Sequence, residues 1–236
     1  MQSSHITTTP RASRLSSSAR PAYLPMLLVF AGTLFTSALL LFLVEPMVGK
    51  MILPMLGGSP AVWNTCMVFY QAMLLVGYLY AHLTTTWLGA RKQAVLHLVL
   101  MAAPFLVLPI AVNKALAPEG EANPVFGVLV LLTVAVGLPF LVVSASAPLL
   151  QKWFASTDHP AAKDPYFLYG ASNLGSMLAL ACYPAIIERK LALYGRWGQS
   201  WTWSWGYGLL AALTATCAYL MWRSSPAVKP DAALGS

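Results

Sequence analysis

The segment PAYLPMLLVFAGTLFTSALLLFLV (Pro21–Val44) holds twenty-four consecutive residues without a charged side chain. A helix needs roughly 20 apolar residues to cross the hydrocarbon core of a bilayer, so this segment predicts one membrane span. Five more charge-free runs follow. The longest is interrupted by Gly57-Gly58-Ser59-Pro60, residues typical of a turn, so the part after this break is long enough for only one span. These five runs are Met51–Ala90, Gln93–Asn113, Ala122–Gln151, Pro165–Ile187 and Trp197–Trp222.

The runs predict an all-α fold, a polytopic membrane helical bundle of about six transmembrane helices. Composition agrees, because 58% of the residues are hydrophobic and 9% are charged, whereas soluble domains have about 45–50% apolar and about 25% charged residues. We expect a disordered cytoplasmic tail at 1–22, a membrane domain at 23–223 and a short cytoplasmic tail at 224–236. The expected spans are 24–44, 62–83, 94–112, 125–150, 165–187 and 203–222.

The net charge of +7 is best explained by basic residues that flank the spans, where they orient helices and meet anionic lipid. We therefore expect the lipid bilayer, and no nucleic acid, as a partner. If the N-terminus is cytoplasmic, inside segments hold nine Lys and Arg residues and outside segments hold five. This bias predicts a multi-pass protein of the cell inner (plasma) membrane with both termini in the cytoplasm. The segment Glu188–Arg196 argues against this orientation, because it places three basic residues outside.

An internal repeat is suggested at an offset of 102 residues. With three spans in each half, such a repeat predicts two inverted three-helix halves, as in each half of a major-facilitator carrier. Three matched positions are few, and coincidence explains them equally well. The matched pairs are Pro46 with Pro148, Lys50 with Lys152, and Gln71 with Asn173.

Glu45 ends the first charge-free run and is the most conspicuous candidate for an intramembrane functional group. Ionisable groups within a bilayer are expensive and often functional. The milder alternative, which we favour, is that its carboxylate reaches interfacial water or pairs with Lys50. Pro46 beside it weakens the helix and frees a carbonyl group.

Asn64, Gln71 and Asn173 are carboxamides in or at the edge of the second and fifth expected spans. Each brings donors and an acceptor that lipid cannot satisfy. Hydrogen bonds between helices are the favoured interpretation. A solute site lined by these side chains is the alternative.

Two rows of small residues predict close helix packing, since small side chains four positions apart let backbones approach. The same rows could equally form the contact face of an oligomer. One row is Ala171, Gly175 and Ala179 in the fifth expected span, and the other is Gly208, Ala212 and Thr216 in the sixth.

No metal, cofactor or catalytic site is predicted. Met47, Met51 and Met55 lie four apart but have no Cys and His partners nearby, and His82 and His97 lack a third ligand. The aromatic cluster before the sixth span, which includes Trp201 and Trp205, suits an interfacial belt better than a quinone or sugar site.

Two stretches resemble the membrane portion of the fused major-facilitator/spermidine-synthase family of bacterial proteins. They are LFLVEPMVGKMILPMLGGSPAVWNTCMVFYQAMLLVGYLYAH (Leu41–His82) and DPYFLYGASNLGSMLALACYPAIIE (Asp164–Glu188), about 67 residues together. In that family the resemblance implies a cytoplasmic Rossmann-like aminopropyltransferase domain for decarboxylated S-adenosylmethionine and a polyamine. Only fourteen residues follow Trp222, without a dinucleotide-type glycine loop, so only the bundle is carried over. Its signature positions here are Glu45, Pro46, Lys50, Gly57, Gly58, Trp63 and Asn64.

The favoured function is a non-enzymatic integral membrane module that anchors or assists a partner protein or complex. The alternative is a small transporter for a polyamine or organic ion. Because full major-facilitator carriers have twelve spans, a six-span carrier of this type requires a homodimer.

Overall fold

A computed structural model describes residues 20–56, 58–113, 115 and 124–224. This part of the chain is helical and contains no strand, which confirms the all-α expectation. The expected tails lie outside the described residues up to residue 19 and from residue 225, as does Gly57. The elements are α1 (Arg20–Leu56), α2 (Pro60–Ala102), η2 (Ala103–Leu106), α3 (Pro124–Leu132), η4 (Thr133–Gly137), α4 (Leu138–Ala155), η5 (Pro160–Lys163), α5 (Tyr166–Cys182), η6 (Tyr183–Ile187), α6 (Glu188–Lys190) and α7 (Gln199–Arg223).

Four helical segments of the described chain are long and apolar enough to cross a membrane. One of them, Pro60–Leu106, bends back on itself and covers the residues of both the second and the third expected span. The sixth expected span, α7, is not among the four, and its first half, QSWTWSWGYG, is rich in Trp, Ser and Gly. The segments are compatible with a membrane protein. They are Tyr23–Leu56, Pro60–Leu106, Val125–Ala155 and Tyr166–Lys190.

The first helix is longer than its charge-free run indicates. It continues past Val44 to Leu56, with Pro46 and Pro54 inside it. Each proline removes one backbone hydrogen bond, but the last turns are held by burial of Met47 and Ile52 against neighbouring helices. Glu45 therefore lies inside a helix and not at its end.

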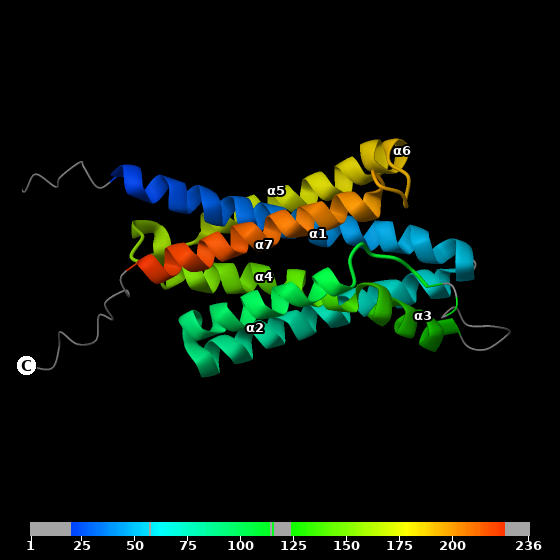
Figure 1. Ribbon diagram of the computed structural model, residues 1–236, viewed down its shortest axis with the longest axis horizontal. Helices are drawn as coiled ribbons and strands as arrows, with labels where there is room; N and C mark the ends of the chain where they lie inside the picture. Colours follow the sequence, from blue (N-terminus) through cyan, green and yellow to red (C-terminus); the bar gives the residue numbers. More distant parts are fainter. Residues whose placement is uncertain (1–19, 57, 114, 116–123, 225–236) are drawn as a thin grey trace, which may run out of the picture.

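The α2 segment reverses direction at Gly89 (φ 70°, ψ 163°), a backbone conformation that side chains disfavour and glycine adopts readily. Its first arm (60–88) and second arm (90–102) run in opposite directions, as Figure 1 shows. The second arm ends as a helix at Leu106, six residues before the expected end of the third span at 112. Pro104 and Pro109 explain the early end, because neither can donate a backbone hydrogen bond.

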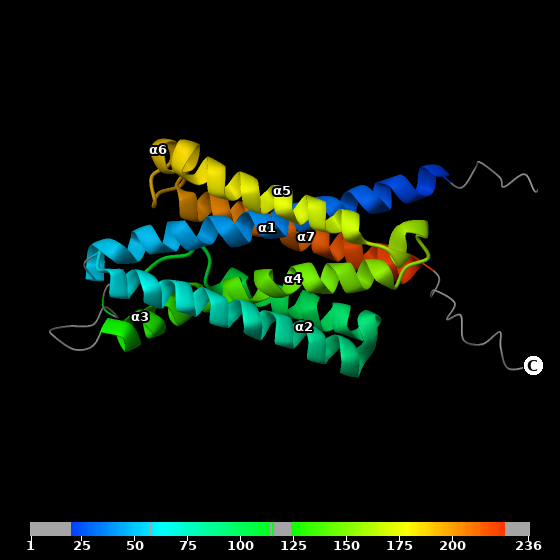
Figure 2. The same cartoon turned by 180° about the vertical axis from the view of Figure 1, so that it is seen from behind.

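The antiparallel helices α1 and α4 occupy the middle of the bundle, and each contacts helices from the other half of the chain. α1 packs against α5 and α7, α4 packs against both arms of α2, and α1 also contacts α4 directly. In Figure 2, α5 and the first arm of α2 flank this pair. The two halves are thus interleaved and not side by side.

The pattern of burial repeats along the chain with the offset of 102 residues. Of the thirteen buried residues of α1, from Met26 to Ile52, twelve have a buried residue 102 positions later in the segment α3–η4–α4. All seven exposed residues between Val68 and Leu79 likewise have an exposed counterpart on α5. Helices related by this offset therefore present the same faces to the bundle.

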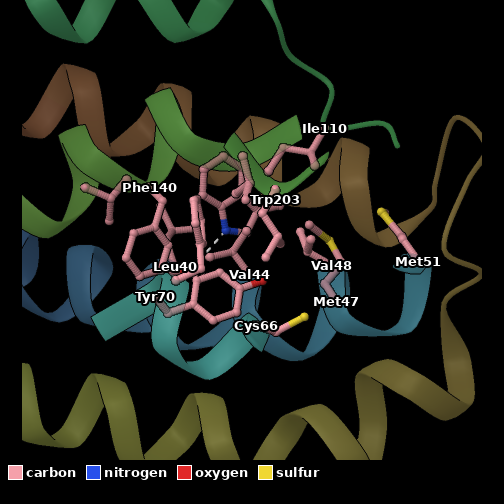
Figure 3. Close-up of a cluster of buried hydrophobic side chains, with 14 of the residues drawn as sticks. Leu40, Val44, Met47, Val48, Met51, Cys66, Tyr70, Ile110, Phe140 and Trp203 are labelled. Atoms are coloured by element: carbon pink, nitrogen blue, oxygen red, sulfur yellow. Dashed lines mark hydrogen bonds between the residues drawn. The ribbon is translucent and has the colours of Figure 1, made fainter. Parts of the chain in front are cut away.

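The core is formed where α1, α2, α4 and α7 meet. Figure 3 shows Trp203 of α7 in its centre, with Tyr70 and Phe140 beside it. The Trp203 indole N–H donates to the backbone carbonyl of Leu40 at 2.9 Å. Tyr207 is fully buried one turn further along α7 and donates to the carbonyl of Met101 at 2.9 Å. These bonds tie α7 to both α1 and the second arm of α2.

Candidate functional site

Glu45 and Lys50 are not paired with each other. Lys50 forms an ion pair with Glu188 of α6, the only ion pair among the described residues. The Glu45 side chain is half-buried, and the Tyr70 hydroxyl lies 3.5 Å from its backbone carbonyl oxygen. The Glu45 carboxylate therefore has no ion-pair partner among the described residues, and Lys50 instead links α1 to the end of the α5 segment.

The three predicted carboxamides are exposed and lie apart. Asn64 and Gln71 lie on the first arm of α2, and Asn173 lies on α5. Gln71 is about 17 Å from the start of its arm, and Asn173 is about 11 Å from the start of its helix, at 1.5 Å per residue. None of the three lines any of the five best-formed pockets. Gln71 and Asn173 instead lie among exposed apolar residues, Gln71 near Val68 and Leu75 on α2 and Asn173 near Leu174 and Met177 on α5.

The two rows of small residues lie in different surroundings. On α5, Gly175 and Ala179 are buried, and a methyl group added at Gly175 would lie 2.4 Å from the carbonyl oxygen of Phe35 on α1. On α7, Gly208 has no atom within 4 Å of the corresponding position, and Ala212 is exposed. The first row lies against α1, whereas the second faces away from the rest of the chain.

A buried polar cluster between the second arm of α2 and α4 was missed by the sequence reasoning. Gln93 and His97 are fully buried one turn apart, and Gln93 Oε1 accepts the indole N–H of Trp153 at 2.7 Å. The ring centroid of His97 lies 6.0 Å from that of Tyr80 and 6.0 Å from that of Trp153. The signal in the sequence was weak: one glutamine and one histidine spaced i, i+4 within an apolar helix.

The hydrogen-bond roles in this cluster follow from Ser146. Its hydroxyl donates to the carbonyl of Val142 at 2.9 Å and therefore accepts from His97 Nε2 at 3.4 Å. Neutral His97 then carries its proton on Nε2 and leaves Nδ1 as an acceptor. His97 Nδ1, Gln93 Nε2 and the Tyr80 hydroxyl are buried and form no hydrogen bond with the described residues.

A pocket of about 310 Å³ opens between the first arm of α2 and α4, near the end of the bundle where α4 ends. Lys152 lies on its rim, and nothing in the sequence distinguished this lysine except its place in the repeat. The lining residues are Tyr78, Ala81, His82, Thr85, Thr86, Pro148 and Lys152.

The aromatic cluster expected before the sixth span lies around the start of α7, with Trp197 the only one of its tryptophans outside the helix, and it divides between surface and core. Trp197 and Trp205 are 81% and 72% exposed and, with Trp201, border an open surface pocket. Trp203 is buried in the core described above. The assignment of the exposed rings to a membrane interface stays a prediction.

His82 and His97, considered above as metal ligands, lie in opposite environments, the first exposed and the second buried. Within the described residues, no three His, Cys, Asp or Glu side chains come together as a metal site.

Comparison with protein-family models, curated proteins and solved structures gives no match. The resemblance to the synthase-linked membrane family therefore stays a prediction from the residues quoted above.

Proposed function

We propose that this chain is a non-enzymatic integral membrane module that works by binding a partner protein within the bilayer. The observation that carries the proposal is the exposure of Gln71 and Asn173 on the apolar surfaces of α2 and α5. Lipid offers these carboxamides no hydrogen-bond partner. Helices of a second protein with polar side chains at the same depth would satisfy them.

The surroundings of the two carboxamides support a protein and not a lipid contact. Of an 18-residue stretch of the α5 segment, only 17% is buried within the chain, and of a stretch of the Pro60–Leu106 segment, which contains the first arm of α2, 28% is buried. By contrast, the corresponding window around α4 is 50% buried. Among the four candidate spans, the two segments that carry Gln71 and Asn173 are thus the least buried.

Photocrosslinking in cell membranes tests this proposal. A benzophenone amino acid at position 71 or 173 is expected to give a discrete protein adduct, because a partner helix would lie within reach. The same amino acid at Phe126, which is 75% exposed on α3, is the control and should give lipid adducts alone. Absence of any protein adduct from positions 71 and 173 would refute the proposal.

A six-span half-carrier that acts as a homodimer is the second candidate, and the repeated burial pattern favours it. Two inverted three-helix halves are expected to bury the same positions in corresponding helices, as α1 and the antiparallel α3–α4 segment do. The interleaved contacts fit the same scheme, since α1 pairs with α5 as α4 pairs with α2. In this case the adduct from position 71 would have twice the mass of the chain.

The carrier candidate predicts a loss of transport on neutralising Glu45. In reconstituted vesicles, Glu45→Gln is expected to reduce uptake of a labelled polyamine or organic cation by about tenfold or more, the usual scale for losing a charged contact. Asp158→Asn, which neutralises an exposed acid without an ion pair among the described residues, is the matched control and should transport like the wild type. Vesicles that are inert to a panel of cationic and anionic solutes would exclude this candidate.

A further inference from the structure

The pocket between the first arm of α2 and α4 contains a lysine without an acidic partner. Lys152 forms no ion pair among the described residues. The two acids in the connection after α4, Asp158 and Asp164, therefore leave its charge unpaired. Arg91, Lys92 and Arg223 belong to the same end of the bundle, where the α2 arms meet and α7 ends. The end is basic, and an anion would be attracted to it.

The offset of 102 residues indicates what is missing beside Lys152. Its counterpart is Lys50, and Glu188, which pairs with Lys50, has Thr86 as its counterpart. Thr86 and Lys152 indeed line the same pocket. At one end of the bundle, therefore, a lysine faces a carboxylate of the chain. At the other end the equivalent lysine faces a hydroxyl and an open space of about 310 Å³.

The donors around this space come from two helices. The hydroxyls of Thr85 and Thr86 already donate to the backbone carbonyls of Ala81 and His82, at 2.7 and 2.8 Å. The remaining donors are the Lys152 ammonium group, the His82 ring and the Tyr78 hydroxyl. None of these three side chains has a hydrogen bond within the described residues. Several donors around one cation suit an anion with several oxygen atoms.

We propose that this pocket is a binding site for a phosphate group, which takes the place that the Glu188 carboxylate has beside Lys50. The phosphate can come from the headgroup of an anionic lipid or from a soluble anion. The pocket lies on the same helix as Gln71, but the site rests on Lys152. A result that refutes the phosphate site would therefore leave the proposed partner contact at Gln71 untouched, and the reverse also holds.

Binding by the purified full-length protein tests the proposal with two probes. Phosphatidylglycerol retention is measured by native mass spectrometry against phosphatidylcholine. Inorganic phosphate is titrated by calorimetry into protein held in phosphatidylcholine nanodiscs. The wild type should bind at least one probe, and Lys152→Gln should weaken that binding by about tenfold or more. Retention of phosphatidylglycerol alone identifies a lipid site, and binding of inorganic phosphate identifies a soluble-anion site.

A second variant tests the inference from the repeat. Thr86→Glu supplies the missing carboxylate within the chain and should likewise reduce binding by about tenfold, while far-ultraviolet circular dichroism stays unchanged because residue 86 is exposed. Lys163→Gln and Lys50→Gln are controls outside the pocket and should bind like the wild type. The proposal is overturned if neither probe binds the wild type. It is also overturned if Lys152→Gln and Thr86→Glu bind as tightly as the controls.

Discussion

Trp153→Ala is expected to lower the free energy of unfolding by about 3–5 kcal/mol, the range found when a large aromatic side chain is removed from a core. Trp153 is fully buried on α4. Its indole N–H donates to Gln93 Oε1, and its ring meets the ring of His97 at an interplanar angle of 75°. The substitution would leave a cavity and also strip Gln93 of its remaining hydrogen bond, since Gln93 Nε2 already lacks a partner.

A second substitution at Trp153 separates the contribution of side-chain volume from that of the hydrogen bond, and a substitution at Trp87 is the control. Trp153→Phe keeps most of the volume but removes the donor, and should cost about 1–3 kcal/mol for the unpaired carbonyl of Gln93. Trp87→Ala is the control, because Trp87 is 75% exposed and its loss should change stability by less than about 0.5 kcal/mol. Reversible denaturation in detergent micelles, followed by circular dichroism, measures all three. Equal midpoints for Trp153→Ala and Trp87→Ala would contradict the expectation.

Gly175→Ala is expected to destabilise the bundle by about 2–3 kcal/mol, at the upper end of the cost of overpacking. The added methyl group would lie 2.4 Å from the carbonyl oxygen of Phe35 and 3.3 Å from Cβ of Ala38. The first contact is with backbone, which cannot turn aside, so α5 would have to move away from α1. The thermal unfolding midpoint of the purified protein measures the effect.

Gly170→Ala is the matched control on the same helix. No atom lies within 4 Å of the methyl position at Gly170, and replacing a helical glycine by alanine gains up to about 1 kcal/mol of helix propensity. Gly77→Ala should fall between the two, because its nearest contact is the Ser144 hydroxyl, a side-chain atom, and the nearest backbone atom, the nitrogen of Ala145, lies at 3.2 Å. If Gly175→Ala and Gly170→Ala have the same thermal unfolding midpoint, the close approach of α5 to α1 is not present in the protein.

Several features of the bundle followed from local sequence. The break at Gly58-Ser59-Pro60 separates α1 from α2, and the Ser59 hydroxyl accepts the N–H of Val62 at the start of the new helix. Helix existence was readable because a long apolar run without charges satisfies its backbone internally. The end of α1 was not readable, because tertiary burial outweighed the prolines at 46 and 54.

The candidate site was less predictable than the helices. Glu45 and Lys50 were paired in one interpretation because they are near in sequence, yet Lys50 reaches Glu188, 138 residues away. The contact between Gln93 and Trp153 also joins distant segments. Neither pairing has a local signal, since each depends on which helices cross and at which turn.

By itself, the sequence determined that the described part of the chain is helical and, to within about four residues, where the six expected helices begin, because charge, proline and glycine act within a few residues of their own positions. It also contained the offset of 102 residues, but with too few matches to separate a repeat from coincidence. Only the tertiary structure decided which faces of these helices are buried. Helices that are apolar on every side carry little amphipathic signal, so the buried stripe is chosen by the neighbours that pack against it. That choice exposed Gln71 and Asn173, buried Gln93 and His97, and left Lys152 beside an open pocket.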